Sequence, residues 1–118
     1  MPILEVTSQK SPKDLKTFAK RLSTVFAEQI GKPEAYCLVT FTKVDELLFA
    51  GSNEDGYLIR VGSIGHIEEE RNINLTKAIT AEIKAELGIE NNRGYVLFTD
   101  YPAANIGFQG TVFSTILK

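Results

Sequence analysis

The chain has 118 residues, a formal net charge of −2 and a single cysteine. This length suits one compact domain, residues 1–118, whose core is large enough to fold without disulfides or a bound metal. The basic residues are scattered among acids and form no concentrated surface of the kind that nucleic acids require. No intramolecular disulfide is possible, no apolar run approaches the ~20 residues of a membrane span, and no signal-peptide pattern opens the chain. A cytoplasmic protein is expected.

The first part of the chain is predicted to form a strand, a helix and a second strand. Residues 2–7 are rich in branched side chains and predict the first strand. Apolar residues at a spacing of 3.6 then predict a helix, with its N-cap at Ser11 and Gly31 just past its end. The second strand is predicted from Tyr36 to Phe41.

The second part repeats this order. A strand is predicted from Tyr57 to Val61, a helix carries apolar residues from Leu75 to Leu87, and a further strand runs from Tyr95 to Thr99. Residues 111–116 are expected to form a last short strand or tail. The repetition suggests a duplicated βαβ unit, although the sequence similarity between the two parts is short enough to arise by chance.

The predicted fold class is α+β. Because βαβ crossovers are right-handed, two such units joined antiparallel put both helices on one face of a four-stranded mixed sheet, with short edge strands besides. Strand parity gives the helix-facing set as Cys37, Val39, Phe41, Ile59, Val61, Val96 and Phe98. The opposite face carries Leu38, Tyr95 and Leu97 among polar residues. Apolar surface of this extent usually marks an interface, so a second subunit is expected to cover it.

Pro2 is the first candidate for chemistry. Removal of Met1 would leave a secondary amine, which titrates near ~8 in water. Desolvation or a nearby cation would lower that pKa, and an amine near ~7 or below is a competent general base. Taken alone, however, Met-Pro is a common start with no catalytic meaning.

Three further positions have two interpretations each. Lys32 either complements the negative end of a helix dipole, or binds an anionic substrate and lowers the pKa of Pro2. Ile64 lies in a loop after a strand, where a backbone N–H can meet a ligand. Tyr95 can donate a hydrogen bond or simply pack.

Together these residues resemble the macrophage migration inhibitory factor family, which includes D-dopachrome tautomerase. The resemblance spans nearly the whole chain with almost no insertions. Its matching pieces are Met1-Pro2, Gly31-Lys32-Pro33 with Tyr36, Phe49-Ala50-Gly51-Ser52, Ser63-Ile64-Gly65, Tyr95, and residues 103–108 with Phe113.

The resemblance implies a homotrimer around a central channel, with active sites at the subunit interfaces. It implies cofactor-free keto–enol tautomerisation of small aromatic 2-oxo acids, of the phenylpyruvate tautomerase or dopachrome isomerase type, with Pro2 as the base. Lys32 and the Ile64 N–H would hold the carboxylate or oxyanion, and Tyr95 would come from the neighbouring subunit. The implied apolar wall consists of Tyr36, Ile106, Phe108 and Phe113.

Three positions depart from the family pattern. Leu97 stands where an asparagine is common in the pocket, Phe108 where a tryptophan is common, and Gly62 where a histidine is common. A more apolar pocket is expected. One alternative is a cytokine-like mediator that binds a receptor, is exported without a signal peptide and has weak or vestigial activity. Another is a different Pro2 reaction, such as decarboxylation or dehalogenation.

Overall fold

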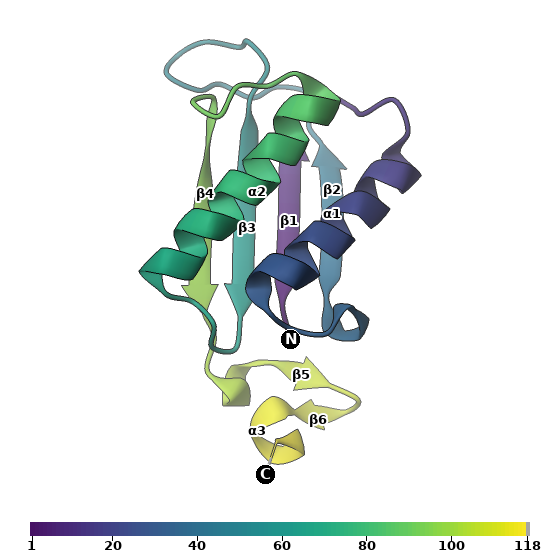
Figure 1. Ribbon diagram of the computed structural model, residues 1–118, viewed down its shortest axis with the longest axis vertical. Helices are drawn as coiled ribbons and strands as arrows, with labels where there is room; N and C mark the ends of the chain where they lie inside the picture. Colours follow the sequence, from purple (N-terminus) through teal and green to yellow (C-terminus); the bar gives the residue numbers. More distant parts are fainter. Residues whose placement is uncertain (118) are drawn as a thin grey trace.

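The computed structural model describes residues 1–117, and Lys118 lies outside the described part of the chain. Four strands form one mixed sheet in the order β2-β1-β3-β4 (Figure 1). Their bounds are β1 Ile3–Ser8, β2 Leu38–Lys43, β3 Tyr57–Ser63 and β4 Gly94–Asp100. The pairs β1–β2 and β3–β4 are parallel, whereas β1 and β3 are antiparallel in the centre. This is the predicted duplicated α+β arrangement.

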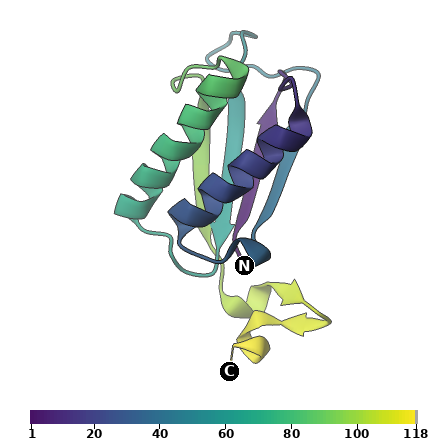
Figure 2. The same ribbon diagram turned by 45° about the vertical axis from the view of Figure 1, so that its right-hand side comes forward.

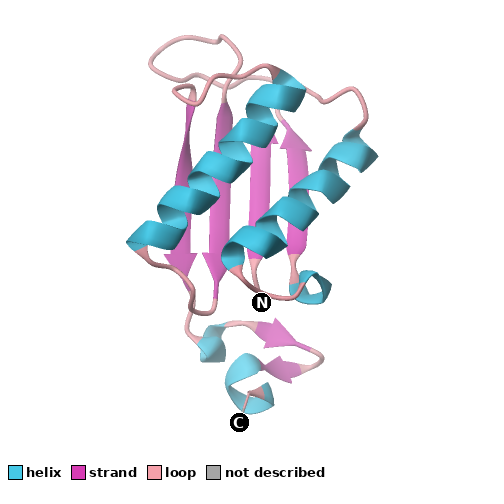
Figure 3. Ribbon diagram, viewed as in Figure 1, coloured by secondary structure: helices cyan, strands magenta, loops and turns pink. Residues whose placement is uncertain are grey.

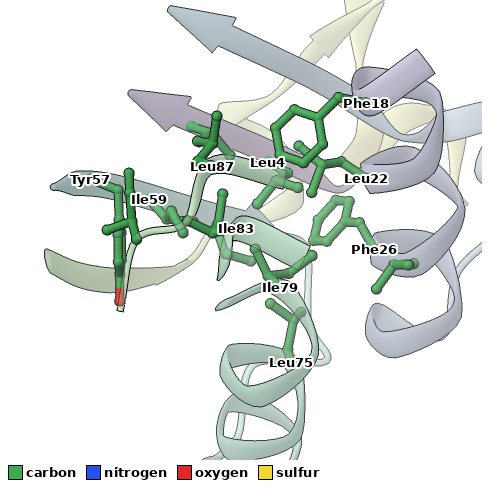
Figure 4. Close-up of a cluster of buried hydrophobic side chains, with 14 of the residues drawn as sticks. Leu4, Phe18, Leu22, Phe26, Tyr57, Ile59, Leu75, Ile79, Ile83 and Leu87 are labelled. Atoms are coloured by element: carbon green, nitrogen blue, oxygen red, sulfur yellow. The ribbon is translucent and has the colours of Figure 1, made fainter. Parts of the chain in front are cut away.

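Both long helices cover the same face of the sheet (Figures 1 and 2). They are α1, Leu15–Ile30, and α2, Glu69–Leu87. Their apolar stripes meet the sheet in one core, where Phe26, Ile59 and Ile79 are completely buried (Figure 4). The predicted helix-facing strand residues either belong to this core or pack against it.

The observed ends of α1 and the observed start of β2 can be compared with the predicted ones. Gly31 follows α1 with φ 72°, the left-handed conformation that favours glycine at this position. The predicted start at Ser11 is wrong, because the N-cap is Asp14, whose carboxylate accepts a hydrogen bond from the Thr17 N–H at 3.1 Å. The predicted start of the second strand is also early, because Tyr36 closes a short 3-10 helix, η1, Glu34–Tyr36.

The C-terminal segment packs beyond one end of the sheet, near the N-terminus (Figure 3). It contains η2, Ala103–Asn105, a hairpin of β5, Gly107–Phe108, and β6, Thr111–Val112, and a last turn of helix, α3, Phe113–Ile116. The prediction of a final strand is therefore correct for two residues only. The Phe113 N–H donates to the Ile106 carbonyl at 3.0 Å and ties the last turn to the hairpin.

The face of the sheet opposite the helices is uncovered in the single chain. Leu38 is 52% exposed and Tyr95 is 66% exposed, whereas Ile59 on the helix side is 0% exposed. This contrast confirms the parity prediction. Among residues 1–117, no helix has both the length and the apolar character needed to cross a membrane.

Candidate active site

A cavity of about 390 Å³ lies at the end of the sheet where β1 and β2 begin and β3 and β4 end. Both ends of the chain contribute to its wall. The lining residues are Met1, Lys32, Pro33, Tyr36, Ile64, Phe108, Gln109, Phe113, Ile116 and Leu117. The cavity is thus built from the start of β1, the end of α1, the loop after β3 and the C-terminal segment.

Pro2 does not itself line this cavity, and its position is fixed by burial and by the sheet. Its side chain is less than 2% exposed, and its carbonyl accepts a hydrogen bond from the Leu38 N–H at 2.9 Å. Met1 precedes it and lines the cavity. In the unprocessed chain the nitrogen of Pro2 is an amide; cleavage after Met1 would convert it to a secondary amine at this point.

Lys32 reaches the cavity because α1 ends immediately before it. The left-handed Gly31 turns the chain away from the helix axis, and the Lys32 ammonium donates to the carbonyl oxygen of Ile64. The loop after β3 is held on the same side by His66, whose Nδ1 lies 2.8 Å from the Ile30 carbonyl. The two contacts connect the end of α1 to the loop that carries Ile64.

The electrostatic environment at the N-terminus favours a neutral amine. The pKa of the Met1 ammonium is lowered, first by burial and then by the positive charge of Lys32, while Cys37 has the opposite effect. The pKa of the Cys37 thiol is itself raised, first by burial and then by Glu34. Cys37 packs against the core, on the helix side that its strand parity predicted.

An aromatic pair forms much of the apolar wall. The rings of Phe108 and Phe113 are stacked with centroids 5.5 Å apart and planes 5° from parallel. Tyr36 also lines the cavity, so three of the four predicted wall residues meet there. Ile106 is not in the lining, but its carbonyl positions Phe113.

Tyr95 and Leu97 do not line this cavity in the same chain. Tyr95 lies near the start of β4, at the opposite end of the sheet, with its ring edge-on to Phe49 at 5.2 Å. Leu97 borders a separate small depression on the helix-free face. Gly62 lies there too, and a Cβ on it would come within 2.5 Å of the Tyr101 ring. The contribution of Tyr95 from a neighbouring subunit stays a prediction.

Several cavity residues were not anticipated from the sequence. Ile116 and Leu117 belong to the tail, and their position depends on a hairpin that is too short to show periodicity. In the turn of that hairpin Gln109 and Gly110 have φ 53° and 78°, as a two-residue type I′ turn requires. The sequence feature that could have predicted this turn is the glycine at its second position.

Comparison with known proteins agrees with this architecture. The family model described as "Macrophage migration inhibitory factor (MIF)" matches residues 1–114. The MIF-like protein mif-2 of Caenorhabditis elegans is 32% identical over 122 residues, covering 100% of this chain and 99% of that protein. Macrophage migration inhibitory factor of Mus musculus is 31% identical over 97 residues, covering 82% and 84% respectively. The crystal structure of the homologue from Prochlorococcus marinus superposes with a TM-score of 0.87 at 27% identity, covering 94% of this chain and 98% of that one.

Proposed function

The chain belongs to the macrophage migration inhibitory factor family, and from this premise we propose that it is a cofactor-free keto–enol tautomerase. The general base is the Pro2 amine after Met1 removal, and the substrate is a small aromatic 2-oxo acid or its enol, as for a phenylpyruvate tautomerase. One observation carries the proposal: the Pro2 ring is buried, and the residue bonded to its nitrogen lines a cavity of about 390 Å³.

The surroundings of the N-terminus support a base that works at neutral pH. An α-amine titrates near ~8 in water. Burial and Lys32 lower the pKa of the Met1 amine, and the same neighbours act on the Pro2 amine, one residue closer to the core. We therefore expect the Pro2 pKa to lie below that of an ordinary α-amine, which increases the fraction of neutral amine at neutral pH.

The cavity wall supports an aromatic, anionic substrate. An ammonium has three N–H donors, and within residues 1–117 the Lys32 ammonium engages the Ile64 carbonyl with one of them. The remaining donors are free to bind a carboxylate. The stacked rings of Phe108 and Phe113 offer an apolar surface for the aromatic ring of the substrate.

The proposed reaction moves one proton and needs no other reactant. The Pro2 nitrogen takes a proton from C3 of the 2-oxo acid, and the electron pair of the C–H bond forms the enolate. Lys32 and the Ile64 N–H stabilise the negative oxygen as it develops. The Pro2 ammonium then returns the same proton to that oxygen, and the enol-to-keto direction is the reverse of these steps.

We further infer a homotrimer around a central channel, in which the helix-free faces of the sheets are covered. The exposed Leu38, Tyr95 and Leu97 support this assembly, because apolar surface of that kind usually meets a partner. Tyr95 and Leu97 would then complete the cavity of a neighbouring copy. Light scattering should give three times the 13.1 kDa of the chain, and a clean monomer would contradict the shared site.

The direct test is tautomerisation of phenylpyruvate by protein whose loss of Met1 is verified by mass spectrometry. Pro2→Gly replaces the buried secondary amine of the ring by a primary amine on a flexible residue, and it should lower kcat/KM by ~10²-fold, within the range of general-base catalysis. Pro12→Gly is the matched control, because Pro12 is also buried but lies before α1. If the wild type is no more active than Pro2→Gly, the tautomerase proposal fails and a cytokine-like interaction role replaces it.

A further inference from the structure

Ser63 ends β3 with a hydroxyl that the fold leaves without a partner. Its side chain is 0% exposed. Within residues 1–117, its Oγ is the one buried side-chain nitrogen or oxygen that makes no hydrogen bond. Burying a hydroxyl without a partner is costly, so such a group calls for an explanation.

The sheet register brings this hydroxyl opposite Pro2. The last printed pair of β1 and β3 at this end is Ile3 with Gly62, so the next pair outward is Pro2 with Ser63. The Pro2 carbonyl bonds to Leu38 of β2, and the Ser63 carbonyl bonds to the Tyr101 N–H beyond β4. The two backbones therefore point away from each other. In such a non-hydrogen-bonded antiparallel pair the side chains approach most closely, and both of these lie on the helix side.

An equivalent serine at the other end of the sheet shows what this position can reach. Ser8 lies opposite Tyr57 in the same pair of strands. Its Oγ donates a 2.6 Å hydrogen bond to the carbonyl of Gly56, which is bonded to the nitrogen of Tyr57. A serine in this register thus lies beside the group attached to the backbone nitrogen of the residue opposite. For Ser63 that nitrogen belongs to Pro2, and Ser63 Oγ makes no hydrogen bond to the Met1 carbonyl attached to it.

We propose that Ser63 is the hydrogen-bond partner of the Pro2 amine in the processed chain, where it orients the amine and helps to hold its proton. An amide proline has no N–H to offer, but the amine released by Met1 removal has one when neutral and two when protonated. Ser63 Oγ donates to the lone pair of the neutral amine and accepts from the ammonium. This positioning role rests on the proposed function.

The direction of the effect follows from the relative strength of the two hydrogen bonds. A bond that involves the charged ammonium is the stronger one, so Ser63 favours the protonated form and raises the pKa of Pro2. The other groups around the N-terminus are the Lys32 ammonium, which lowers that pKa, the Cys37 thiol, which opposes Lys32, and the Tyr36 phenol at the cavity wall. Ser63 keeps the amine basic enough to hold the proton between its two transfers.

The test is a direct titration of the Pro2 amine by NMR in processed protein labelled with ¹⁵N-proline. Ser63→Ala should lower the Pro2 pKa by about half a unit to one unit, the scale of a charge-assisted hydrogen bond against a neutral one. Ser8→Ala is the matched control and should leave that pKa unchanged, although it removes a hydrogen bond that is made. An unchanged pKa in Ser63→Ala, or an equal shift in both variants, would overturn the proposal.

A second measurement covers any general effect of Ser63→Ala on folding. The substitution should lower the Tm of the processed chain and leave the Tm of a chain that keeps Met1 unchanged or raised, because only the processed amine supplies a partner. Equal losses of Tm in both forms would contradict the proposal. The titration needs no substrate, so a shifted pKa in a protein without tautomerase activity would refute the proposed function alone. An active protein whose pKa does not shift would refute the role of Ser63 alone.

Discussion

The two ends of the sheet are built from equivalent parts and differ in how completely those parts are used. α1 and α2 each end at a left-handed glycine, Gly31 and Gly88. The next residue is Lys32 at the cavity end, where it is half-buried with its charge at the wall. At the far end it is Ile89, which is 2% exposed and belongs to the core. The same turn thus delivers a cation to a cavity in one half and an apolar anchor to the core in the other.

Hydrogen bonding separates the two ends in the same way. At the far end Ser8 bonds Gly56, and the guanidinium of Arg93 donates to carbonyls of the loop between β2 and β3. At the cavity end Ser63 has no partner within residues 1–117. The buried serine hydroxyl is thus hydrogen-bonded at the far end and unpartnered at the cavity end, where the proposed base lies, as expected of a functional site.

The largest expected effect is on stability at the far end. Ile89→Ala removes a buried side chain from the core, so the free energy of unfolding should fall by about 2–5 kcal/mol. Denaturant unfolding measures this, and the titration of the Pro2 amine in the same variant should be unchanged. A loss well under 1 kcal/mol would remove the distinction between a structural end and a functional end.

The reciprocal change at the cavity end should affect activity instead. Lys32→Ile removes the charged donor for the substrate carboxylate, so kcat/KM should fall by roughly 10- to 100-fold, mainly through KM. Because Lys32 lowers the pKa of the N-terminal amine, its loss should also raise the Pro2 pKa and shift the pH profile upward. Lys84→Ile, which removes an exposed cation paired with Glu90, is the control. Equal kinetics for both variants would contradict the assignment.

Tyr95 tests whether the far end of one copy serves the cavity of another. Its hydroxyl is expected to bond the substrate across a subunit interface, so Tyr95→Phe should lower kcat/KM by about threefold to tenfold. Stability should change little, because the side chain is 66% exposed in the single chain. Steady-state kinetics of the trimeric fraction decide this, and unaltered kinetics would exclude Tyr95 from the site.

Most of the fold could be predicted because period and parity are local properties of the sequence. The apolar stripes of both helices and the two faces of the strands follow directly from side-chain direction. The helix start was misplaced because Ser11 and Asp14 are both good caps, and only the bond from Thr17 decides between them. Tyr36 was assigned to a strand because a single turn of 3-10 helix has no period of its own.

The site was predictable only in part, because strand register and the packing of the C-terminal tail do not follow from local sequence patterns. The order of the motifs predicted Pro2 and Lys32 as site residues, and the structure places Lys32 and Met1 at the same cavity. Ile64 was expected to use its N–H, and the structure adds that its carbonyl binds Lys32. Ser63 had no signal of its own, since its proximity to Pro2 depends on how β1 pairs with β3.

The pH dependence of catalysis tests the central claim most directly. A base must be neutral to accept a proton, so kcat/KM should fall as the pH drops through the Pro2 pKa and should level off above it. The kinetic pKa should lie below the ~8 of an ordinary α-amine and should coincide with the value from ¹⁵N titration of Pro2. A kinetic pKa that differs from the Pro2 titration, or a profile without this limb, would contradict Pro2 as the base.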